Sequence, residues 1–373
     1  MNTVKAYIDL QALRFNIEKI KDTLPKCKIV SVIKADAYGH GSVACAKALD
    51  DLVECFAVAR IEEAIELREA GVSKNIILLG GFFLEDELPL VEKYDLSFAI
   101  HDVWQIEILE KYQASKKIKG WCQINIGMQR LGFNVDQVKD VYKRISNIQC
   151  IQNPIGLIAH LSCADEESTK AFNELQLSAW NSVKDISEGP LCLLNSAAIE
   201  YYSEYSTDFI RPGIIQYGVS PSSNKTGIEL GLKPVMTLCS KVISIRNVDV
   251  GDAVGYGAYW ICDKKTRIAI VAAGYADGYP RSMPNGCPVL INGQVMHTVG
   301  HVCMDMMFVD IGLDSEVNIN DEVVLWGKGL PVEHIAQRVG TIPYELLTRV
   351  TKRVKYIYNY KLKKPHLNMR LLF

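Results

Sequence analysis

The stretch Lys28–Gly41, KIVSVIKADAYGHG, decides the fold. It begins with a short apolar run, Lys28–Lys34, of the kind that forms a buried strand, and a glycine-containing loop follows. Seven similar runs alternate with longer amphipathic stretches, which is the pattern of βα units. They are Cys55–Ala59, Asn75–Gly80, Leu96–Ile100, Trp121–Ile126, Pro154–His160, Leu191–Ser196 and Phe209–Gly218. Eight units predict a closed (β/α)8 barrel, with an extra segment, Thr3–Leu24, ahead of the first strand.

The segments between the runs have helical periodicity. In Ile61–Ala70 the apolar residues fall near one face, and Gly71 follows at the position of a helix stop. An open, doubly wound parallel sheet is the alternative architecture. The sequence argues against a dinucleotide-binding sheet of this kind, because no GxGxxG motif follows a strand.

Beyond the turn-rich stretch Pro221–Gly227 the pattern changes to short strands with frequent turns, such as Asn292-Gly293. We therefore expect an α/β architecture in which a TIM-like (β/α)8 barrel is followed by a β-rich C-terminal domain. The expected boundaries are residues 1–232 for the barrel and 233–373 for the β-rich domain. The first strand segment is available to pair with the second domain.

Composition limits the function. The chain has 373 residues with 41 Lys and Arg against 43 Asp and Glu, so no basic excess supports a nucleic-acid binder. No apolar run approaches the ~18–20 residues needed to span a bilayer, and Asp9 falls where a signal peptide has its apolar core. Eleven cysteines without a CxxC pair favour a reducing compartment over a disulfide framework or zinc knuckle. We expect a cytoplasmic protein.

Several residues at the predicted strand ends suit one cofactor, and barrel active sites lie at these ends. Lys34 closes an apolar run, so either its amine extends to solvent or burial lowers its pKa for Schiff-base chemistry. Asn195-Ser196 and Gly213-Ile214 lie where barrels often bind phosphate, and Tyr38 could add a phenol donor. With His160 to lie flat against a ring, this set suits pyridoxal 5′-phosphate.

These residues carry a family resemblance. The stretch Ile33–Gly41 (IKADAYGHG) resembles the pyridoxal-lysine motif of the alanine racemase family. Further matches follow in family order at Gly127–Gly132, Gly156–His160, Asn195–Ala198, Arg211–Gly218, Gly255–Gly257, Gly274–Tyr279, Val299–Asp305 and Pro343–Glu345. The resemblance implies interconversion of L- and D-alanine, a peptidoglycan precursor, by two-base proton transfer on a pyridoxal-phosphate aldimine. It also implies a head-to-tail homodimer whose active site takes residues from both subunits.

The resemblance also implies roles for individual residues. Lys34 is one base, and Tyr256 of the partner subunit is the other, on the opposite face of the planar carbanion. Because a neutral phenol is a poor base at pH 7, His160 and then Arg211 are implied as a relay that activates it. Arg211 lies at the pyridine nitrogen, where a fixed cation disfavours protonation and shortens the life of the carbanion.

The remaining implied contacts divide between cofactor and substrate. Arg130 holds the substrate carboxylate and the phenolic oxygen of the cofactor. The other cofactor contacts are Tyr38, His160, Asn195, Ser196, Gly213, Ile214 and Tyr344. The other substrate contacts are Met304 and Asp305, donated by the partner, and Tyr275 at a narrow entrance.

The chain departs from the family pattern ahead of Arg130. Many members carry a carbamylated lysine that gives this arginine an anionic partner, but here the position is Gln123, with Asn125 and Ile126 replacing an acid and a hydroxyl. We expect either that the Gln123 amide oxygen holds the guanidinium or that a small anion such as chloride lies between them. His301 stands where arginine is common.

Four other interpretations remain open at this point. A serine or broad-specificity racemase and a pyridoxal-dependent decarboxylase share the fold. A non-catalytic pyridoxal-phosphate carrier generally lacks the β-rich domain. Metal-dependent hydrolysis would need His297, His301, Cys303 and Asp305 on one face of a strand.

Overall fold

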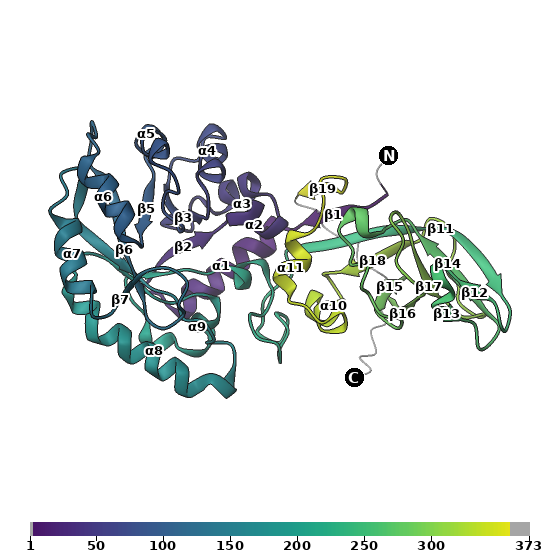
Figure 1. The fold of residues 1–373 in the computed structure, drawn as a ribbon. Coiled ribbons are helices and arrows are strands. Elements are labelled where there is room, and N and C mark those ends of the chain that lie inside the picture. Colours follow the sequence, from purple (N-terminus) through teal and green to yellow (C-terminus); the bar gives the residue numbers. More distant parts are fainter. Residues whose placement is uncertain (1–2, 359–373) are drawn as a thin grey trace. The chain divides into compact units, whose positions relative to one another are not determined.

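The computed structural model describes residues 3–358, which group into two compact units. We call residues 14–216 and 221–224 the barrel unit; residues 3–13, 217–220 and 225–358 form the β unit (Figure 1). Residues 3–13, 217–220 and 225–232, which we expected in the first domain, therefore group with the second. The last part of the expected second domain, residues 359–373, lies outside the described residues.

Eight parallel strands of the barrel unit form a closed barrel. Each strand arises from one of the eight predicted runs, and the order is β5-β4-β3-β2-β10-β9-β8-β6, closed by pairing between β5 and β6. The strands are β2 (Lys28–Val32), β3 (Cys55–Val58), β4 (Asn75–Leu78), β5 (Ser97–Ile100), β6 (Ile118–Asn125), β8 (Ile151–Ile158), β9 (Leu191–Cys192) and β10 (Phe209–Ile210). The predicted (β/α)8 barrel is confirmed, and the open-sheet alternative is wrong. A short additional strand, β7 (Phe133–Asn134), pairs with β6.

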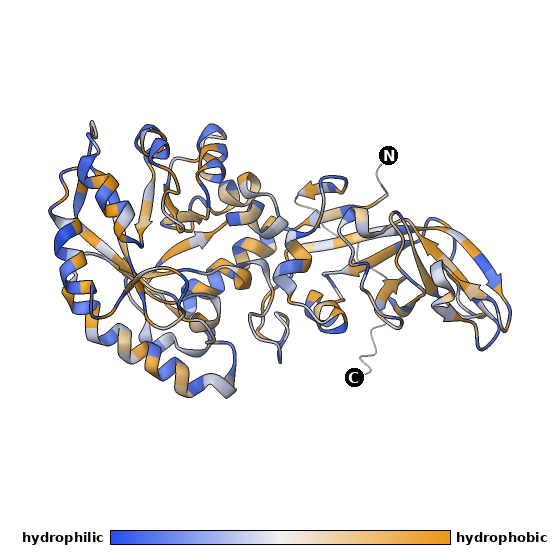
Figure 2. Ribbon diagram, viewed as in Figure 1, coloured by the Kyte–Doolittle hydropathy of each residue, from blue (hydrophilic) through white to orange (hydrophobic). Residues whose placement is uncertain are grey.

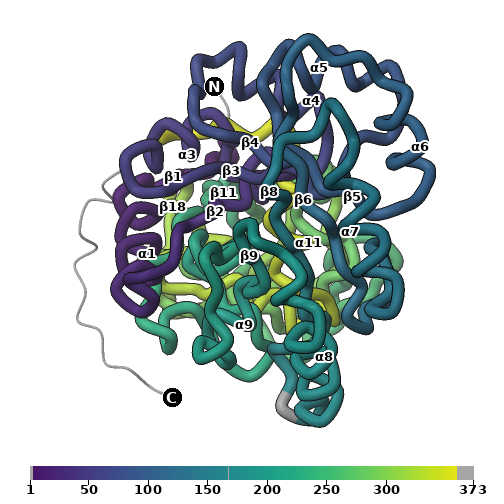
Figure 3. The backbone as a smooth tube through the Cα atoms, turned by 90° about the vertical axis from the view of Figure 1, so that its left-hand side faces the viewer, coloured from purple at the N-terminus to yellow at the C-terminus, as the bar shows by residue number. Residues whose placement is uncertain are grey.

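Helices lie outside these strands (Figure 3). They are α1 (Leu10–Thr23), α3 (Ser42–Leu49), α4 (Ile61–Glu69), α5 (Leu88–Lys93), α6 (Val103–Lys111), α7 (Val138–Ser146), α8 (Lys170–Val183) and α9 (Ser196–Tyr201). The element α2 (Lys34–Gly39), directly after β2, is a left-handed turn. In α4 the residues Ile61, Ala64 and Leu67 are buried, as the periodicity predicted. Gly71, with φ of +88°, ends it in the left-handed region that glycine adopts without strain.

The barrel strands are buried on both faces, which explains their nearly continuous hydrophobic sequence. All four residues of β3 and all four of β5 are buried, and the strands are predominantly orange in Figure 2. Phe56 and Phe98 are completely covered. Burial of one such side chain contributes roughly 1.5–3 kcal/mol, so these runs dominate the stability of the barrel.

The β unit is a second closed structure. Its long strand β11 (Met236–Val248) pairs with β14 on one side and β18 on the other, completing a ring in the order β11-β14-β17-β16-β15-β18. The other strands are β14 (Thr266–Val271), β15 (Pro288–Ile291), β16 (Gln294–Val299), β17 (Met307–Asp310) and β18 (Glu322–Trp326). The Asn292-Gly293 turn joins β15 to β16, and both residues have positive φ, as a two-residue hairpin requires.

Three further features belong to the β unit. Strand β1 (Lys5–Ile8) pairs antiparallel with β11 and parallel with β19 (Lys355–Tyr358), so the first strand belongs to this sheet. Strands β12 (Ala253–Val254) and β13 (Trp260–Ile261) form a separate hairpin. Helices α10 (Val332–Val339) and α11 (Pro343–Thr348) follow β18. Within residues 3–358, no helix has the length and apolar character required for a membrane span.

Candidate active site

Five of the predicted site residues follow the ends of barrel strands. Lys34 follows β2, Arg130 follows β6, His160 follows β8, Ser196 follows β9 and Arg211 follows β10. Because all these strands are parallel, their carboxyl ends meet at one end of the barrel. The sequence pattern therefore brings one amine, two guanidinium groups, an imidazole and a hydroxyl to a single surface.

The backbone after Lys34 turns in the left-handed sense. Ala35, Asp36, Ala37 and Tyr38 all have φ between 51° and 54°, and none of them is glycine. Left-handed helical conformation costs an L-residue roughly 1–2 kcal/mol, so four in succession require strong anchoring by their surroundings. This left-handed turn, residues 35–38, is the most strained feature of the site.

Two sets of contacts hold the left-handed turn. At its beginning, the amide of Ala35 donates to Oε1 of Glu63 over 2.6 Å. At its end, the amide of Ser42 donates to Oδ1 of Asp36 over 2.7 Å, and Nδ1 of the buried His40 donates to the carbonyl of Ala37 over 2.9 Å. Thus His40 is a structural contact of the loop, and its ring shapes the segment that carries Lys34.

The surroundings of Lys34 favour a neutral amine. Burial, followed by the positive charge of Arg130, lowers the pKa of Lys34, and Arg211 acts in the same direction. The Glu63 carboxylate opposes this shift. A lowered pKa makes more of the amine available as a nucleophile or base near neutral pH.

Three polar groups form a small cradle beside the turn. The amide of Gly213 lies 2.8 Å from Oγ of Ser196, to which it donates. A Cβ atom at position 213 would lie 2.8 Å from the hydroxyl oxygen of Tyr38, so only glycine permits this approach. Burial raises the pKa of Tyr38 to about 12, and the phenol therefore remains a donor at neutral pH. Ile214 begins the 3₁₀ turn η5 (Ile214–Tyr217) directly after Gly213.

Arg211 is held on both arms of its guanidinium. Nη1 donates to the carbonyl oxygen of Cys192 over 3.2 Å and to its sulfur over 3.0 Å. Nη2 donates to the carbonyl of Ala159 over 2.8 Å and to Nδ1 of His160 over 3.1 Å. The side chain is only 5% exposed, so this cation is fixed in position and direction.

His160 is consequently a neutral imidazole with a defined tautomer. A guanidinium can only donate, so Nδ1 of His160 accepts and Nε2 carries the proton. Burial, and then the charge of Arg211, lower the pKa of His160 to about 3. Nε2 lies 3.2 Å from Nδ2 of Asn195, which donates one of its two hydrogens to the carbonyl of Leu161 over 2.8 Å.

Asn125 organises the loop that carries Arg130. Its Oδ1 accepts from the amides of Gly127 and Gln129, each at 3.1 Å, and its Nδ2 donates to the side chains of Gln129 and Asn134. The amide that replaces an acid at this position thus closes a turn. Its function here is positional and needs no negative charge.

Arg130 makes no ion pair with any carboxylate of the described residues, residues 3–358. Its side chain is exposed and lines a small cavity together with Gln123 and His160. The other lining residues are Ile124, Asn125, Ile126, Met128 and Leu131. A cation, two side-chain amides and an imidazole form the polar part of this wall, which suits an anion.

Tyr256 lies in the β unit, on the turn between β12 and β13. It begins the 3₁₀ turn η6 (Tyr256–Ala258) and is 71% exposed. Gly255 lets the turn approach closely, because a Cβ there would lie 2.9 Å from the ring of Phe308. Tyr259 stacks on His301 with 4.0 Å between ring centroids, which braces the other end of the turn.

The predicted substrate contacts of the β unit lie on two touching loops. The amides of Tyr275 and Ala276 donate to the carbonyls of Cys303 and Met304. The Asp305 carboxylate pairs with Arg353 over 2.9 Å, and Arg353 also reaches Asp277. Because its charge is offset by Arg353, Asp305 repels a nearby carboxylate less than an unpaired acid would. Tyr344 lies in α11, half-buried.

The proposed metal ligands do not share a strand face. His297 lies in β16, whereas His301, Cys303 and Asp305 lie in the loop that follows it. The prediction that these four residues lie on one strand and share one face is therefore wrong. Across residues 3–358 no three His, Cys, Asp or Glu side chains are grouped so as to hold a metal ion.

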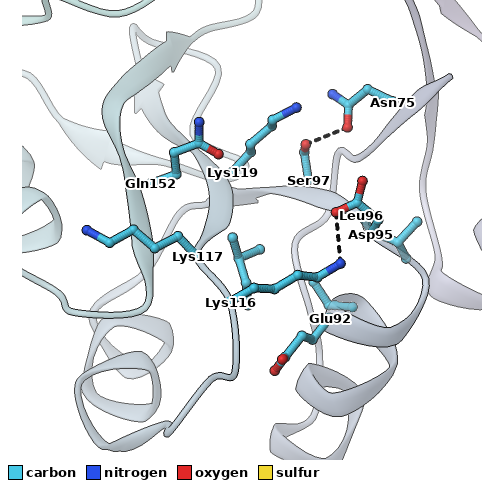
Figure 4. A pocket seen from close by; sticks show the side chains of 11 residues that line it. Asn75, Glu92, Asp95, Leu96, Ser97, Lys116, Lys117, Lys119 and Gln152 are labelled. Atoms are coloured by element: carbon cyan, nitrogen blue, oxygen red, sulfur yellow. Dashed lines mark hydrogen bonds and ion pairs between the residues drawn. The ribbon is translucent and has the colours of Figure 1, made fainter.

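A second cavity lies at the amino-terminal ends of the barrel strands (Figure 4). Its lining includes the first residues of β4 and β5, Asn75 and Ser97, which hydrogen bond to one another over 2.8 Å. Lys116 pairs with Asp95 over 3.1 Å. These polar groups are thus paired with one another, and residues at this end of a barrel typically contribute to stability and not to catalysis. The cavity is not a candidate active site.

Sequence reasoning missed Glu63 and Cys192, which support Lys34 and Arg211. Glu63 occupies the third position of α4, where a carboxylate is typical of a helix cap, so its contact with Ala35 left no signal in the sequence. Cys192 reads as an ordinary apolar residue of β9. Its contact with Arg211 depends on the pairing of β9 with β10, which brings the two side chains together.

The fold and the site define a (β/α)8-barrel enzyme in which a lysine of lowered pKa lies near two arginines, combined with a β unit that presents an exposed tyrosine. A family model described as alanine racemase, N-terminal domain, matches residues 8–221, and one described as alanine racemase, C-terminal domain, matches residues 235–358. The chain belongs to the alanine racemase family.

Individual relatives match over nearly the whole chain. The alanine racemase of Coxiella burnetii is 44% identical over 362 residues, covering 96% of this chain and 99% of the relative. That of Shewanella amazonensis is 43% identical over 355 residues, covering 94% and 97%. The crystal structure of the biosynthetic alanine racemase from Pseudomonas aeruginosa has a TM-score of 0.93 and 39% identity, covering 96% of this chain and all of that one.

Proposed function

We propose that this enzyme interconverts L-alanine and D-alanine, using pyridoxal 5′-phosphate and a head-to-tail homodimer. Membership of the family supports the reaction and substrate. The observation that carries the proposal is the grouping of a half-buried amine of lowered pKa, Lys34, with Arg211 and the neutral His160. A serine or broader specificity is the alternative, and none of the relatives described above carries such a name.

The residues fit the cofactor. Tyr38, Ser196 and Gly213 lie together, and a Cβ atom at position 213 would come too close to the Tyr38 hydroxyl. The glycine therefore leaves this group of polar donors open, which suits the oxygens of a phosphate group. Ile214 follows at the same turn, and Tyr344 would join the site from the β unit. Lys34 is the amine that would bind the aldehyde. His160 and Asn195 would lie beside the ring.

When bound, pyridoxal 5′-phosphate withdraws electrons from the α-carbon of an attached amino acid and so acidifies its α-proton. Arg211 is fixed by four contacts, and it would hold a positive charge at the ring nitrogen. A cation there disfavours protonation of that nitrogen. This limits electron withdrawal and favours return of the proton to the α-carbon over competing reactions.

Two bases on opposite faces would move the proton. Lys34 would take or return it on one face, and the partner subunit's Tyr256 would do so on the other. Tyr256 is mostly exposed on its own chain, which suits a side chain that works in a neighbouring site. His160 would donate its Nε2 proton to the phenolate and thereby stabilise it.

Arg130 would orient the substrate. Its guanidinium, on the loop that Asn125 closes, suits both the substrate carboxylate and the phenolic oxygen of the cofactor. Met304 and Asp305 of the partner subunit would complete the carboxylate end, and Tyr275 would narrow the entrance. A chloride or similar anion would occupy the cavity between Gln123 and Arg130.

Purified enzyme given L-alanine should form D-alanine, detected by chiral chromatography, and the Lys34→Ala variant should form none. L-serine should be converted at a much lower kcat/KM. Faster conversion of serine, or full activity of Lys34→Ala, would overturn the assignment.

All eleven cysteines are free of disulfide bonds, which supports a cytoplasmic location.

A further inference from the structure

We propose that Glu63 is a positioning residue for Lys34, and that its carboxylate clamps the left-handed turn 35–38 to the loop that begins α4. The inference deepens the proposed function, because it assumes that Lys34 is the reacting amine. It concerns a residue outside the expected cofactor and substrate contacts.

The Glu63 carboxylate accepts hydrogen bonds from two segments that are distant in sequence. Oε1 accepts from the amide of Ala35 over 2.6 Å. Oε2 accepts from the amide of Ala59 over 2.8 Å and from that of Arg60 over 3.1 Å. One side chain therefore ties the peptide after Lys34 to the end of strand β3.

The clamp acts where the backbone is most strained. Four consecutive L-residues with positive φ persist only if their surroundings determine the conformation. Asp36 and His40 hold the far end of the turn, through the Ser42 amide and the carbonyl of Ala37. Among the described residues, Glu63 provides the corresponding side-chain contact at the near end, one residue from Lys34.

Helix capping does not explain all three of these contacts. The bond from the Arg60 amide to Oε2 is the usual interaction of a capping box at the start of α4. The bond from Ala35 to Oε1 contributes nothing to that helix. A glutamine has a single carbonyl oxygen. The Glu63→Gln side chain could therefore accept hydrogen bonds from one of the two segments and would lose those from the other.

The charge of Glu63 adds an electrostatic effect on the same amine. The charged and titratable groups around Lys34 are Arg130, Arg211, His160 and Glu63. Burial and the two arginines lower the pKa of Lys34, and Glu63 alone opposes them. Removing its charge should lower that pKa further, which shifts the corresponding limb of the pH profile to lower pH.

The test compares Glu63→Gln with Asp102→Asn in the full-length holoenzyme. Asp102 is a matched control, because it caps α6 by accepting from the Trp104 amide over 3.3 Å and has no contact with the turn. Hydrogen exchange followed by mass spectrometry would report on the peptide containing residues 34–39. The pH dependence of kcat, together with KM, would report on the amine.

We expect Glu63→Gln to speed exchange in residues 34–39 at least tenfold and to lower kcat at least tenfold, with KM changed less than threefold. The limb of its pH profile that reports on Lys34 should move to lower pH. Asp102→Asn should match the wild type in hydrogen exchange, in kcat and in the pH profile. Wild-type exchange and pH profile in Glu63→Gln, or equal effects in both variants, would overturn the inference. If Lys34→Ala retained activity, the proposed function itself would fail, whatever Glu63→Gln showed.

Discussion

The Arg211 guanidinium donates to Nδ1 of His160 over 3.1 Å, and this contact determines which imidazole nitrogen carries the proton. Because arginine stays charged at every physiological pH, the arrangement does not reverse on titration. His160 thus remains a neutral Nε2–H donor directed away from Arg211. The two side chains behave as one polarised unit, in which the cation orients the imidazole.

Replacing Arg211 with methionine should release His160 from this control. Loss of the cation removes a cause of the lowered pKa, so the pKa of His160 should rise from about 3. Racemisation should fall by about 100-fold, as expected for loss of a general acid–base arrangement. NMR of ¹⁵N-labelled histidine at several pH values would measure the titration.

Arg68→Met is the matched control for that experiment. Arg68 also binds backbone carbonyls, those of Val72, Lys74 and Tyr94, but far along the chain from His160. It should lower stability while leaving the His160 titration unchanged. A His160 titration that is identical in Arg211→Met and wild type would show that the contact does not set its protonation.

Tyr256→Phe should lower racemisation by roughly 10²–10⁴-fold, because one of the two bases is lost. The side chain is mostly exposed, so the free energy of unfolding should change by less than about 0.5 kcal/mol. Exchange of the α-proton with deuterated water should slow for one enantiomer of alanine and persist for the other, which still meets Lys34. Tyr259→Phe, which keeps a ring against His301, should behave as the wild type. Equal slowing for both enantiomers would argue against separate bases.

The cavity between Gln123 and Arg130 predicts a requirement for a small anion. Exchanging chloride for gluconate at constant ionic strength, so that screening is unchanged, should raise KM for alanine at least fivefold. Gln123→Glu supplies a carboxylate at the same place and should make KM insensitive to the exchange. An equal KM of the wild-type enzyme in both salts would instead favour direct contact between the Gln123 amide and Arg130.

Acid should destabilise the fold through buried neutral histidines. Burial lowers the pKa of His40 to about 4, so between pH 6.5 and 4 the unfolded chain binds more protons than the folded one. Stability is complete above pH 6.5 and is lost as pH falls toward 4, by roughly 2–3 kcal/mol at ~1.4 kcal/mol per pKa unit.

Urea unfolding at pH 7 and pH 4.5 would measure this loss. His40→Gln removes the titrating group and should show a smaller difference between the two pH values. His297→Gln, at an exposed position of β16, should keep the full difference. If His40→Gln and wild type lost equal stability, burial of this imidazole would not be the cause.

The barrel was predictable because its strands are buried on both faces, which leaves continuous apolar runs such as NIILLG at Asn75–Gly80. The residues at the strand ends followed from the shared direction of the strands. The left-handed turn was not predictable, since Ala35–Tyr38 has the composition of an ordinary right-handed helix and the anchors at Glu63 and Asp36 act through tertiary contacts. Tyr256 was found only through the family resemblance, because no local pattern distinguishes a reactive tyrosine from a turn residue.

Strand β1 has both of its neighbours much later in the chain, at Met236–Cys239 and Lys355–Tyr358. During synthesis one edge of this first segment must wait for Met236–Cys239, and the other edge must wait for Lys355–Tyr358, which is made when almost the whole polypeptide has left the ribosome. A fragment that ends after the barrel would therefore carry an open strand edge, which is prone to pair with other chains. To express the barrel as an independent fragment, Lys5–Ile8 should therefore be removed as well. In a circular permutant that starts at α1, β1 would follow β19 in the chain and would be made after both of its partner strands.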